Sequence, residues 1–286
     1  MVYATLGRPD IMADALGFMR EQTQRPDVIV ISAVAASDVM PVPDDLNVKV
    51  VFGPKGSSHQ RNTGVEAIRG DVDVVVFFDD DYAPDPGFIA TLDAILTSNP
   101  AIAGVNGKTL ADGIKGPGYN FDEARQILAD FRPPPFSQAV VKPVPSLYGC
   151  NMAVRLAMAD GIGFDEALPL YAWQEDVDYS TQLARRGSLI WCSALGGVHL
   201  GVKRARTPGL RMGYSQIANP IYLRRKRTMA LAHAYTLMGK NLAANFFRSF
   251  SPEPWCDRRG RLTGNFMALQ DFIGGKLHPR NILNLD

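Results

Sequence analysis

The first hundred residues alternate between short continuous apolar runs and stretches in which apolar residues recur at helical spacing. The continuous runs predict strands at Met1–Thr5, Asp27–Ser32, Val48–Phe52 and Asp73–Phe78. Helical spacing follows Asp10 and returns in Gly64–Arg69 and Pro86–Ser98. This alternation predicts an α/β fold with a doubly wound, largely parallel central sheet flanked by helices.

The middle of the chain has a different pattern. Glycine and proline cluster within residues 106–148, which predicts a loop-rich region. Ser146–Arg155 is expected to form a strand that enters a helix, and Gly161–Trp173 a loop. The helix that follows this loop is predicted to end at Gly187 as its C-cap, before a short strand at Leu189–Cys192.

Beyond Arg211 the pattern becomes helical and basic. Residues 1–200 carry 15 Lys and Arg against 25 Asp and Glu, whereas residues 201–286 carry 15 against 4, so the net charge of +1 divides into −10 and +11. A basic end can face an anionic membrane, a phosphorylated ligand or nucleic acid, or pair with the acidic body. We expect no nucleic-acid partner. For Ile221–Met238, a helix on a membrane surface and a packed helix with a solvated basic edge are both open.

Composition places the chain among ordinary globular proteins. It has 286 residues, of which 46% are hydrophobic and 21% charged. Cys150, Cys192 and Cys256 make neither a disulfide framework nor a zinc site and fit a reducing cytosol. No apolar run approaches the roughly 18 residues that suggest a membrane span. We therefore expect a cytoplasmic protein, with peripheral contact to the inner face of the membrane as an additional hypothesis.

The stretch Val72–Pro86 carries the clearest chemical signal, because its apolar run ends in Asp79, Asp80 and Asp81. Open α/β sheets bind ligands beyond the carboxyl ends of their strands, which is where these aspartates fall. Adjacent carboxylates repel one another unless a cation lies among them, and hard divalent ions prefer carboxylate oxygen. The stretch predicts a Mg²⁺ or Mn²⁺ site; a solvated turn that caps the next helix is the alternative.

Four further groups are candidates for chemistry. Glu175-Asp176 begins a predicted helix, where acids also serve as caps. His199 follows a strand between glycines, as either a ligand or a packed residue. Gly53–Gly64 would let the backbone approach a phosphate, although it lacks the spacing of known nucleotide-binding loops. The arginines of Lys203–Gln216 would clamp an anion.

The order of these groups resembles that of the family 2 glycosyltransferases of the GT-A fold. The resemblance covers roughly residues 2–215 and rests on six segments: Thr5-Leu6-Gly7-Arg8-Pro9, Gln60-Arg61-Asn62-Thr63-Gly64, Asp79-Asp80-Asp81, Gly149-Cys150-Asn151-Met152-Ala153-Val154-Arg155, Glu175-Asp176 and His199-Leu200-Gly201. The family often has an acidic residue directly after its second strand to read the base. Ser32 or the later Asp38 stands in that place here.

The resemblance implies a Rossmann-like catalytic domain at residues 1–215, with a nucleotide-binding half at 1–105 and an acceptor half at 106–215. Residues 216–286 would form a helical extension. The implied reaction is inverting transfer of a sugar, of hexosyltransferase type, from a nucleotide-diphosphate sugar to a hydroxyl. A UDP-sugar is the expected donor, and a saccharide or lipid-linked molecule the expected acceptor, in polysaccharide or glycoconjugate synthesis.

The resemblance also implies roles for individual residues. Asp176 would be the general base, with Glu175 beside it. Asp79, Asp81 and His199 would hold the divalent metal. The nucleotide sugar would contact a larger set: Thr5, Arg8, Ser32, Arg61, Asn62, Asp79, Asp80, Gly149, Asn151 and Arg211.

Two rival functions use the same features. A sugar-phosphate nucleotidyltransferase shares the need for a metal and a nucleotide pocket, but would not require Glu175-Asp176. A non-catalytic protein that binds a nucleotide sugar or polysaccharide would require neither Asp81 nor Asp176. Release of nucleotide diphosphate from a panel of nucleotide sugars separates these possibilities.

Overall fold

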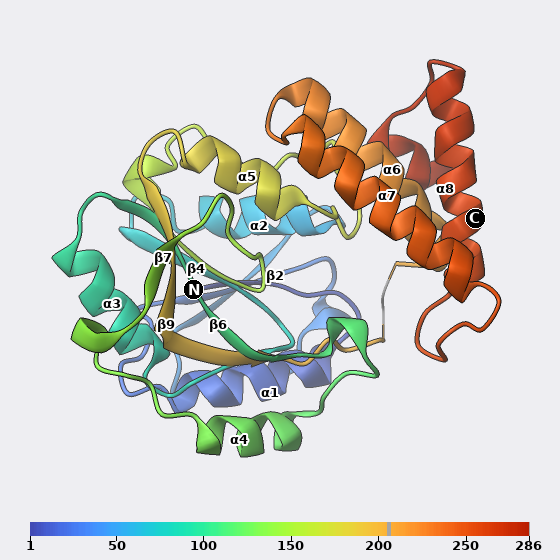
Figure 1. The fold of residues 1–286 in the computed structure, drawn as a ribbon. Helices are drawn as coiled ribbons and strands as arrows, with labels where there is room; N and C mark the ends of the chain where they lie inside the picture. The colour runs from blue at the N-terminus through green and yellow to red at the C-terminus, as the bar shows by residue number, and fades with distance from the viewer. Residues whose placement is uncertain (205–206, 286) are drawn as a thin grey trace. The chain divides into compact units, whose positions relative to one another are not determined.

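Nine strands form a single mixed sheet in the part of the chain that the computed structural model describes, residues 1–204 and 207–285 (Figure 1). The strands are β1 Val2–Ala4, β2 Ile29–Ala33, β3 Val48–Phe52, β4 Val74–Asp79, β5 Tyr82–Pro84, β6 Ile102–Asp112, β7 Val141–Pro143, β8 Asn151–Arg155 and β9 Ser188–His199. The α-helices are α1 Pro9–Arg20, α2 Ser57–Glu66, α3 Phe88–Ser98, α4 Phe121–Asp130, α5 Glu175–Leu183, α6 Gly209–Lys226, α7 Leu231–Arg248 and α8 Arg258–Ile273.

The chain divides into two compact units, each described by itself. The first contains Met1–Lys55, His59–Gly163 and Gln182–Ala205, and holds the sheet with α1, α3 and α4. The second contains Gly56–Ser58, Phe164–Thr181 and Arg206–Asp286, and holds α6, α7 and α8. The predicted α/β fold with helices in its C-terminal part is confirmed. The predicted domain boundary at residue 215 falls inside α6 and stays a prediction.

One half of the sheet is parallel, as the sequence predicts. β1 pairs in parallel with β2 and with β4, and β2 pairs in parallel with β3. Ala4 therefore lies between Ser32 and Asp79, and the carboxyl ends of three strands meet at one edge. In the other half β8 is antiparallel to β4 and β6, whereas β6 and β9 are parallel.

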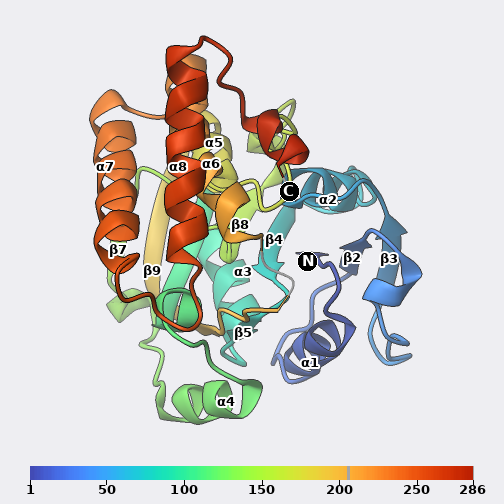
Figure 2. The same ribbon diagram turned by 90° about the vertical axis from the view of Figure 1, so that its right-hand side faces the viewer.

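Alternate residues of the parallel strands face opposite layers. Tyr3, Ile31 and Phe78 share a hydrophobic cluster with residues of α1 and α3. Val2 faces the other side, where Gly64 of α2 approaches so closely that a Cβ would lie 2.5 Å from Val2 Cγ1. Helices α1 and α2 thus lie on opposite faces of the sheet (Figure 1, Figure 2), which explains why the strands are apolar on both sides.

The predicted loop-rich region, residues 106–148, also contains the second half of β6 and helix α4, which the sequence did not predict. The glycines of β6 mark close packing: a Cβ at Gly107 would lie 2.7 Å from the Leu195 carbonyl oxygen. Helix α4 begins with a capping box, in which Asn120 accepts from the N–H of Glu123 and Glu123 accepts from the N–H of Asn120.

Gly53–Gly64, whose glycines suggested a backbone approach to phosphate, is mostly helix, since α2 begins at Ser57 and ends at Glu66. The predicted helix at Gly64–Arg69 is therefore placed too late. Polar residues face the sheet here: the side-chain amide of Gln60 donates to the carbonyl oxygens of Thr5 at 2.7 Å and Ser32 at 2.8 Å. An apolar spacing cannot reveal a helix whose buried face is polar.

Two boundaries in the later part of the first unit also differ from prediction. β9 extends through His199, so this histidine ends the strand and does not follow it. Gly187 is not a C-cap, because α5 ends at Leu183; a Cβ at Gly187 would lie 2.8 Å from the Ala101 carbonyl oxygen. After β8 the chain makes a short 3₁₀ turn, Leu156–Met158, and no α-helix.

In the second unit, α6 packs against both α7 and α8 (Figure 2). Its contact with α8 is close, since a Cβ at Gly264 would lie 2.0 Å from the Leu210 carbonyl oxygen. Gln216, Asn245 and Asn265 form a buried hydrogen-bonded network that joins the three helices. Among the described helices none is long and apolar enough to cross a membrane.

Two glycine-to-alanine substitutions test this packing with opposite expected signs. Gly264→Ala should lower the free energy of unfolding by about 1–3 kcal/mol, because the new methyl group collides with backbone. Gly239→Ala on α7 should raise it by roughly 0.5–1 kcal/mol, because nothing lies within 4 Å of the new Cβ and alanine favours a helix. Urea unfolding of both variants measures the difference; equal effects would contradict the helix contact.

Candidate active site

Two carboxylates and one imidazole meet at the end of the sheet. Asp79 ends β4, Asp81 immediately precedes β5, and His199 ends β9. The His199 Nε2 atom lies 3.7 Å from Asp79 Oδ2 and 3.6 Å from Asp81 Oδ1. One potential ligand atom from each residue lies within 4.8 Å of the others, so this cluster could hold a metal ion. The alternative of a solvated turn is excluded, because Asp80 and Asp81 are buried.

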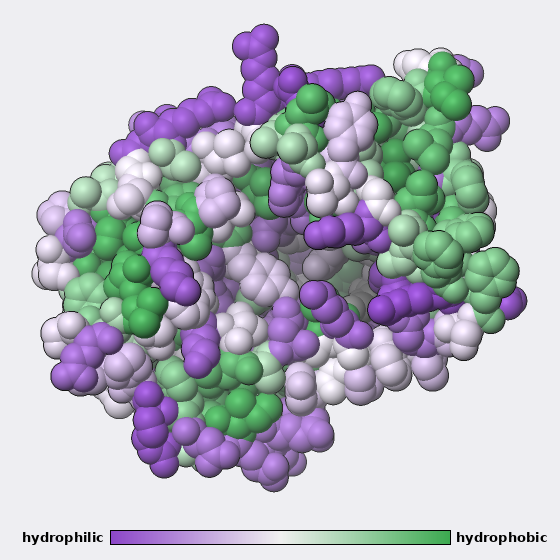
Figure 3. All heavy atoms as spheres, in the orientation of Figure 1, coloured by the Kyte–Doolittle hydropathy of each residue, from purple (hydrophilic) through white to green (hydrophobic). Residues whose placement is uncertain are grey.

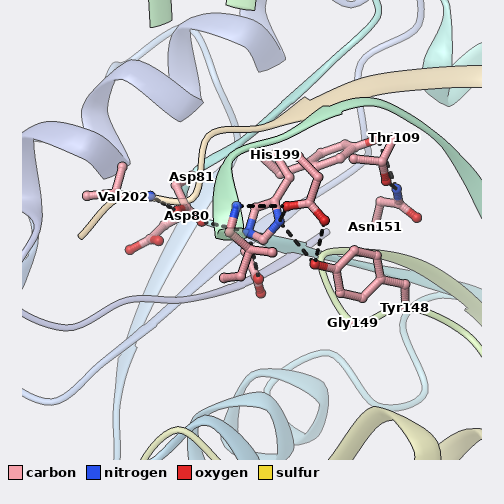
Figure 4. Close-up of polar contacts among 12 residues, drawn as sticks. Asp80, Asp81, Thr109, Tyr148, Gly149, Asn151, His199 and Val202 are labelled. Carbon is pink, nitrogen blue, oxygen red and sulfur yellow. Dashed lines mark hydrogen bonds and ion pairs between the residues drawn. The ribbon is translucent and has the colours of Figure 1, made fainter. Parts of the chain in front are cut away.

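Backbone pairing fixes Asp81 in this cluster. β5 runs antiparallel to β9 with Tyr82 opposite His199, and the Leu200 N–H donates to the Asp81 carbonyl oxygen at 2.8 Å. The Val202 N–H donates to Asp81 Oδ2 at 2.8 Å (Figure 4). Gly201 between them has φ +68°, and a Cβ there would lie 2.3 Å from the Gly113 carbonyl carbon. The turn after His199 therefore requires glycine.

Asp81 and His199 each shift the pKa of the other towards its charged form. Burial acts to raise the pKa of Asp81, but the hydrogen bond and charge of His199, with Arg8 and the Val202 N–H, lower that pKa well below its usual range. Burial acts to lower the pKa of His199, but hydrogen bonds with Asp112 and Asp81 raise it to about 10. The neighbouring carboxylates therefore favour the protonated ring.

Asp112 and Tyr148, which the sequence did not indicate, complete the surroundings of His199. Asp112 ends β6, and its Oδ1 lies 3.0 Å from His199 Nδ1. The Tyr148 hydroxyl lies 3.2 Å from the same ring nitrogen and donates to Asp112 Oδ2 at 3.2 Å (Figure 4). An acid at the end of a strand was the available signal, but the loop prediction for residues 106–148 concealed the strand.

Asp80 faces away from the cluster. Its side chain is fully buried, with Oδ2 accepting from the Thr5 hydroxyl at 2.7 Å and Oδ1 lying 2.6 Å from Arg8 Nη2. Burial raises the pKa of Asp80 to about 7, against the opposing effect of Arg8. In this arrangement Asp80 positions Thr5 and Arg8. Its predicted contact with a nucleotide sugar stays a prediction.

Arg61 connects two other predicted residues. Its Nη2 donates to Asp79 Oδ1 at 2.9 Å and to the Gly149 carbonyl oxygen at 3.2 Å. The neighbouring Asn62 is partly buried on α2. Arg61 thus links Asp79, the most exposed of the three aspartates, to the backbone of Gly149.

Asn151 and Ser32 are buried more deeply. Asn151 Oδ1 accepts from Asn106 Nδ2 at 2.7 Å, and its Nδ2 donates to the Tyr82 hydroxyl at 3.1 Å. Ser32 lies inside β2 with no exposed surface. Asp38, the alternative reader of a base, accepts backbone hydrogen bonds from Gly7, Val34 and Ala35. The contacts of Asp38 organise the loops after β1 and β2. A nucleotide-binding role for Asn151, Ser32 and Asp38 stays a prediction.

Part of the sequence matches a known protein family. Residues 31–151 match the model of the family described as Glycosyl transferase family 2. The predicted resemblance to the family 2 glycosyltransferases is confirmed. None of the curated proteins matches the chain.

Solved structures share the fold of this chain. A mannosyltransferase from Pyrobaculum calidifontis, in complex with GDP-Man and Mn²⁺, aligns with TM-score 0.51 and 14% identity over 99% of this chain and 84% of its own. TarS 1–349 from S. aureus, in complex with UDP-GlcNAc, gives 0.53 and 15% over 99% and 82%. GalNAc-T7, with UDP, GalNAc and Mn²⁺, gives 0.53 and 14% over 96% and 58%. These likenesses show the GT-A fold.

The remaining predicted site residues lie in the second unit. Glu175 and Asp176 begin α5, and the Asp176 Oδ1 accepts from the Val177 N–H at 2.8 Å. Asp178, by contrast, is fully buried, and its Oδ2 atom forms an ion pair with Lys226 Nζ at 2.7 Å. This contact indicates a structural role for Asp178. Arg211 donates from Nε to the Leu285 carbonyl oxygen at 2.8 Å. The predicted roles of Glu175, Asp176 and Arg211 stay predictions.

Adjacent aspartates give a matched test of the cluster. Asp81→Asn should weaken Mn²⁺ binding by more than the roughly 10–100-fold typical of changes outside the ligand set, because it removes a charge from the cluster. Asp80→Asn should leave Mn²⁺ affinity within about threefold of wild type and instead lower thermal stability, because its oxygens face Thr5 and Arg8. Titration of free Mn²⁺ by electron paramagnetic resonance measures the affinity of both variants, and thermal unfolding measures their stability. Equal losses of Mn²⁺ affinity would contradict the assignment.

Proposed function

We propose that this glycosyltransferase is an inverting enzyme that transfers a sugar from a nucleotide-diphosphate sugar to a hydroxyl of a saccharide or lipid-linked acceptor. The supporting observation is the convergence of Asp79, Asp81 and His199 at the end of a GT-A sheet. The structural neighbours bind GDP-Man, UDP-GlcNAc, or UDP with GalNAc, and these share a nucleotide diphosphate. A UDP-sugar is our proposed donor, a hexosyl group the transferred sugar, and polysaccharide or glycoconjugate synthesis the setting.

The ligand set fits a divalent ion. Two carboxylates suit Mg²⁺ and Mn²⁺, and the imidazole of His199 favours Mn²⁺ of the two. Such an ion, when bound, neutralises the charge that develops on a departing diphosphate. Arg8 and Arg61 already place positive charge beside the aspartates, so the end of the sheet is suited to hold an anionic donor.

Asp176 is the proposed general base. It would accept the proton of the acceptor hydroxyl as that oxygen attacks the anomeric carbon, and attack from the side opposite the leaving group inverts the configuration. Its position in the first turn of α5 lies at the positive end of the helix dipole. Asp178 is excluded from this role in the described structure by its burial and its pair with Lys226.

Asp176→Asn tests the base directly. The amide keeps the shape and caps a helix about as well, so donor affinity and stability should be preserved. Turnover should fall by about 10²–10⁴-fold, the usual contribution of a positioned base. The measurement is release of nucleotide diphosphate across a panel of nucleotide sugars with Mn²⁺ present.

Two controls accompany this variant. Glu175→Gln should cost less turnover, because only one carboxylate can face the acceptor oxygen. Asp178→Asn should lower thermal stability more than turnover, because it breaks a buried ion pair. Transfer at the wild-type rate by Asp176→Asn, or a product that retains the donor's anomeric configuration, would overturn the inverting mechanism with this base.

We further propose that the second unit contacts an anionic membrane from the cytoplasmic side. Phe246, Phe247 and Phe250 pack against one another at the end of α7 and are 46%, 70% and 75% exposed. Figure 3 shows apolar residues gathered over α7. Trp255 follows in the next loop, 41% exposed. This aromatic cluster lies within the part of the chain that carries the charge balance of +11, a combination that favours anionic lipid surfaces.

Liposome flotation tests this contact. The wild type should float with vesicles of anionic phospholipid and much less with zwitterionic ones, because both apolar insertion and charge contribute. Phe247→Ser with Phe250→Ser should reduce flotation several-fold, whereas Phe136→Ser, an exposed phenylalanine of the first unit, should not. Equal recovery of wild type and double variant would leave these helices with a packing role only.

A further inference from the structure

The pairing of strands β6 and β9 places Asp112 beside the second ring nitrogen of His199, Nδ1. Asp112 and His199 are the last residues of β6 and β9 and lie directly opposite each other in the parallel register. Two register shifts between Gly107 and Ala111 precede this pairing. After it, a Cβ at Gly113 would lie 1.9 Å from the Leu200 carbonyl oxygen, so the two chains stay in close contact beyond the strands.

The contact determines which side of the imidazole faces the aspartates. A carboxylate only accepts, so the Asp112 Oδ1 atom, 3.0 Å away, requires a hydrogen on His199 Nδ1. The other nitrogen, Nε2, then points to Asp79 and Asp81. The Tyr148 hydroxyl donates to the second oxygen of Asp112 and holds that carboxylate in turn.

We propose that Asp112 is a positioning residue, which orients the His199 ring so that Nε2 serves as the third ligand of the divalent ion. The inference rests on the metal site of the proposed function. A ligating histidine commonly donates its other N–H to a carboxylate, which fixes the ring and raises its basicity; loss of such a partner typically costs about 10–100-fold in metal affinity.

Asp112 also has a local structural contact, because its Oδ1 accepts from the Ile114 N–H at 3.1 Å and caps a short 3₁₀ helix. Two substitutions separate this contact from the proposed role. Asp112→Ser keeps a capping hydroxyl but shortens the side chain, so the contact with the imidazole is lost. Asp112→Asn keeps both a cap and an acceptor for the Nδ1 hydrogen, and loses only the charge.

The experiment is Mn²⁺ titration of the full chain, combined with electron spin echo detection of ¹⁴N coupling to the bound ion. The wild type should show imidazole nitrogen coupled to Mn²⁺. Asp112→Ser should bind Mn²⁺ about 10–100-fold more weakly and lose most of that coupling. Asp112→Asn should retain the coupling with a smaller loss of affinity. Asp122→Asn, an exposed acid of α4, is the control and should match the wild type.

Three outcomes would overturn the inference, and they are distinguishable. Asp112→Ser with wild-type affinity and coupling would show that Asp112 does not orient the ring. Mn²⁺ bound to the wild type without ¹⁴N coupling would remove His199 as a ligand and leave the glycosyltransferase proposal intact. No Mn²⁺ binding by the wild type would overturn the metal dependence of the proposed function together with this inference. Thermal unfolding confirms that each variant is folded.

Discussion

Three consecutive carboxylates at the buried end of a strand are the constraint around which the first unit is arranged. Each has a cationic group nearby: Arg61 for Asp79, Arg8 for Asp80 and His199 for Asp81. Removing one partner of a buried ion pair costs about 3–5 kcal/mol, so these contacts stabilise the fold. In the turn between β4 and β5, Asp80 faces Thr5 and Arg8 whereas Asp79 and Asp81 lie near His199, which separates a positioning carboxylate from two potential ligands.

This arrangement gives a physical meaning to the sequence segments on which the family resemblance rests. The segment after β1 supplies Thr5 and Arg8, and both contact Asp80. The segment on α2 supplies Gln60, which satisfies carbonyl oxygens at two strand ends, and Arg61, which pairs with Asp79. Gly201 permits the turn by which the Val202 N–H reaches Asp81. These segments thus all help to stabilise the aspartates at the end of β4.

The sequence predicted the parallel strands, α1, α3 and the acidic strand end, because continuous apolar runs and helical spacing report burial directly. It did not predict β6, whose glycines are present for close packing against Leu147 and Leu195. It placed α2 too late because the buried face of that helix is polar. The partnership of Asp112 with His199 could not be predicted from the sequence, since it depends on a register set by three shifts between β6 and β9.

The loop that precedes α5 in the second unit stores backbone strain next to the proposed base. Leu170, Ala172 and Gln174 adopt φ values of 58°, 51° and 76°, which cost non-glycine residues of order 1–3 kcal/mol each. The loop is held in this form by packing of Leu168 and Ala172 with residues of α6, and by hydrogen bonds from Asn219 Nδ2 to the Trp173 carbonyl oxygen and from the Asp178 N–H to the Gln174 carbonyl oxygen. Strain of this kind persists only where surrounding contacts over-determine it. A cap alone would not need three left-handed residues at alternate positions, so the fixed approach to Glu175 and Asp176 supports a positioned base over a helix cap alone.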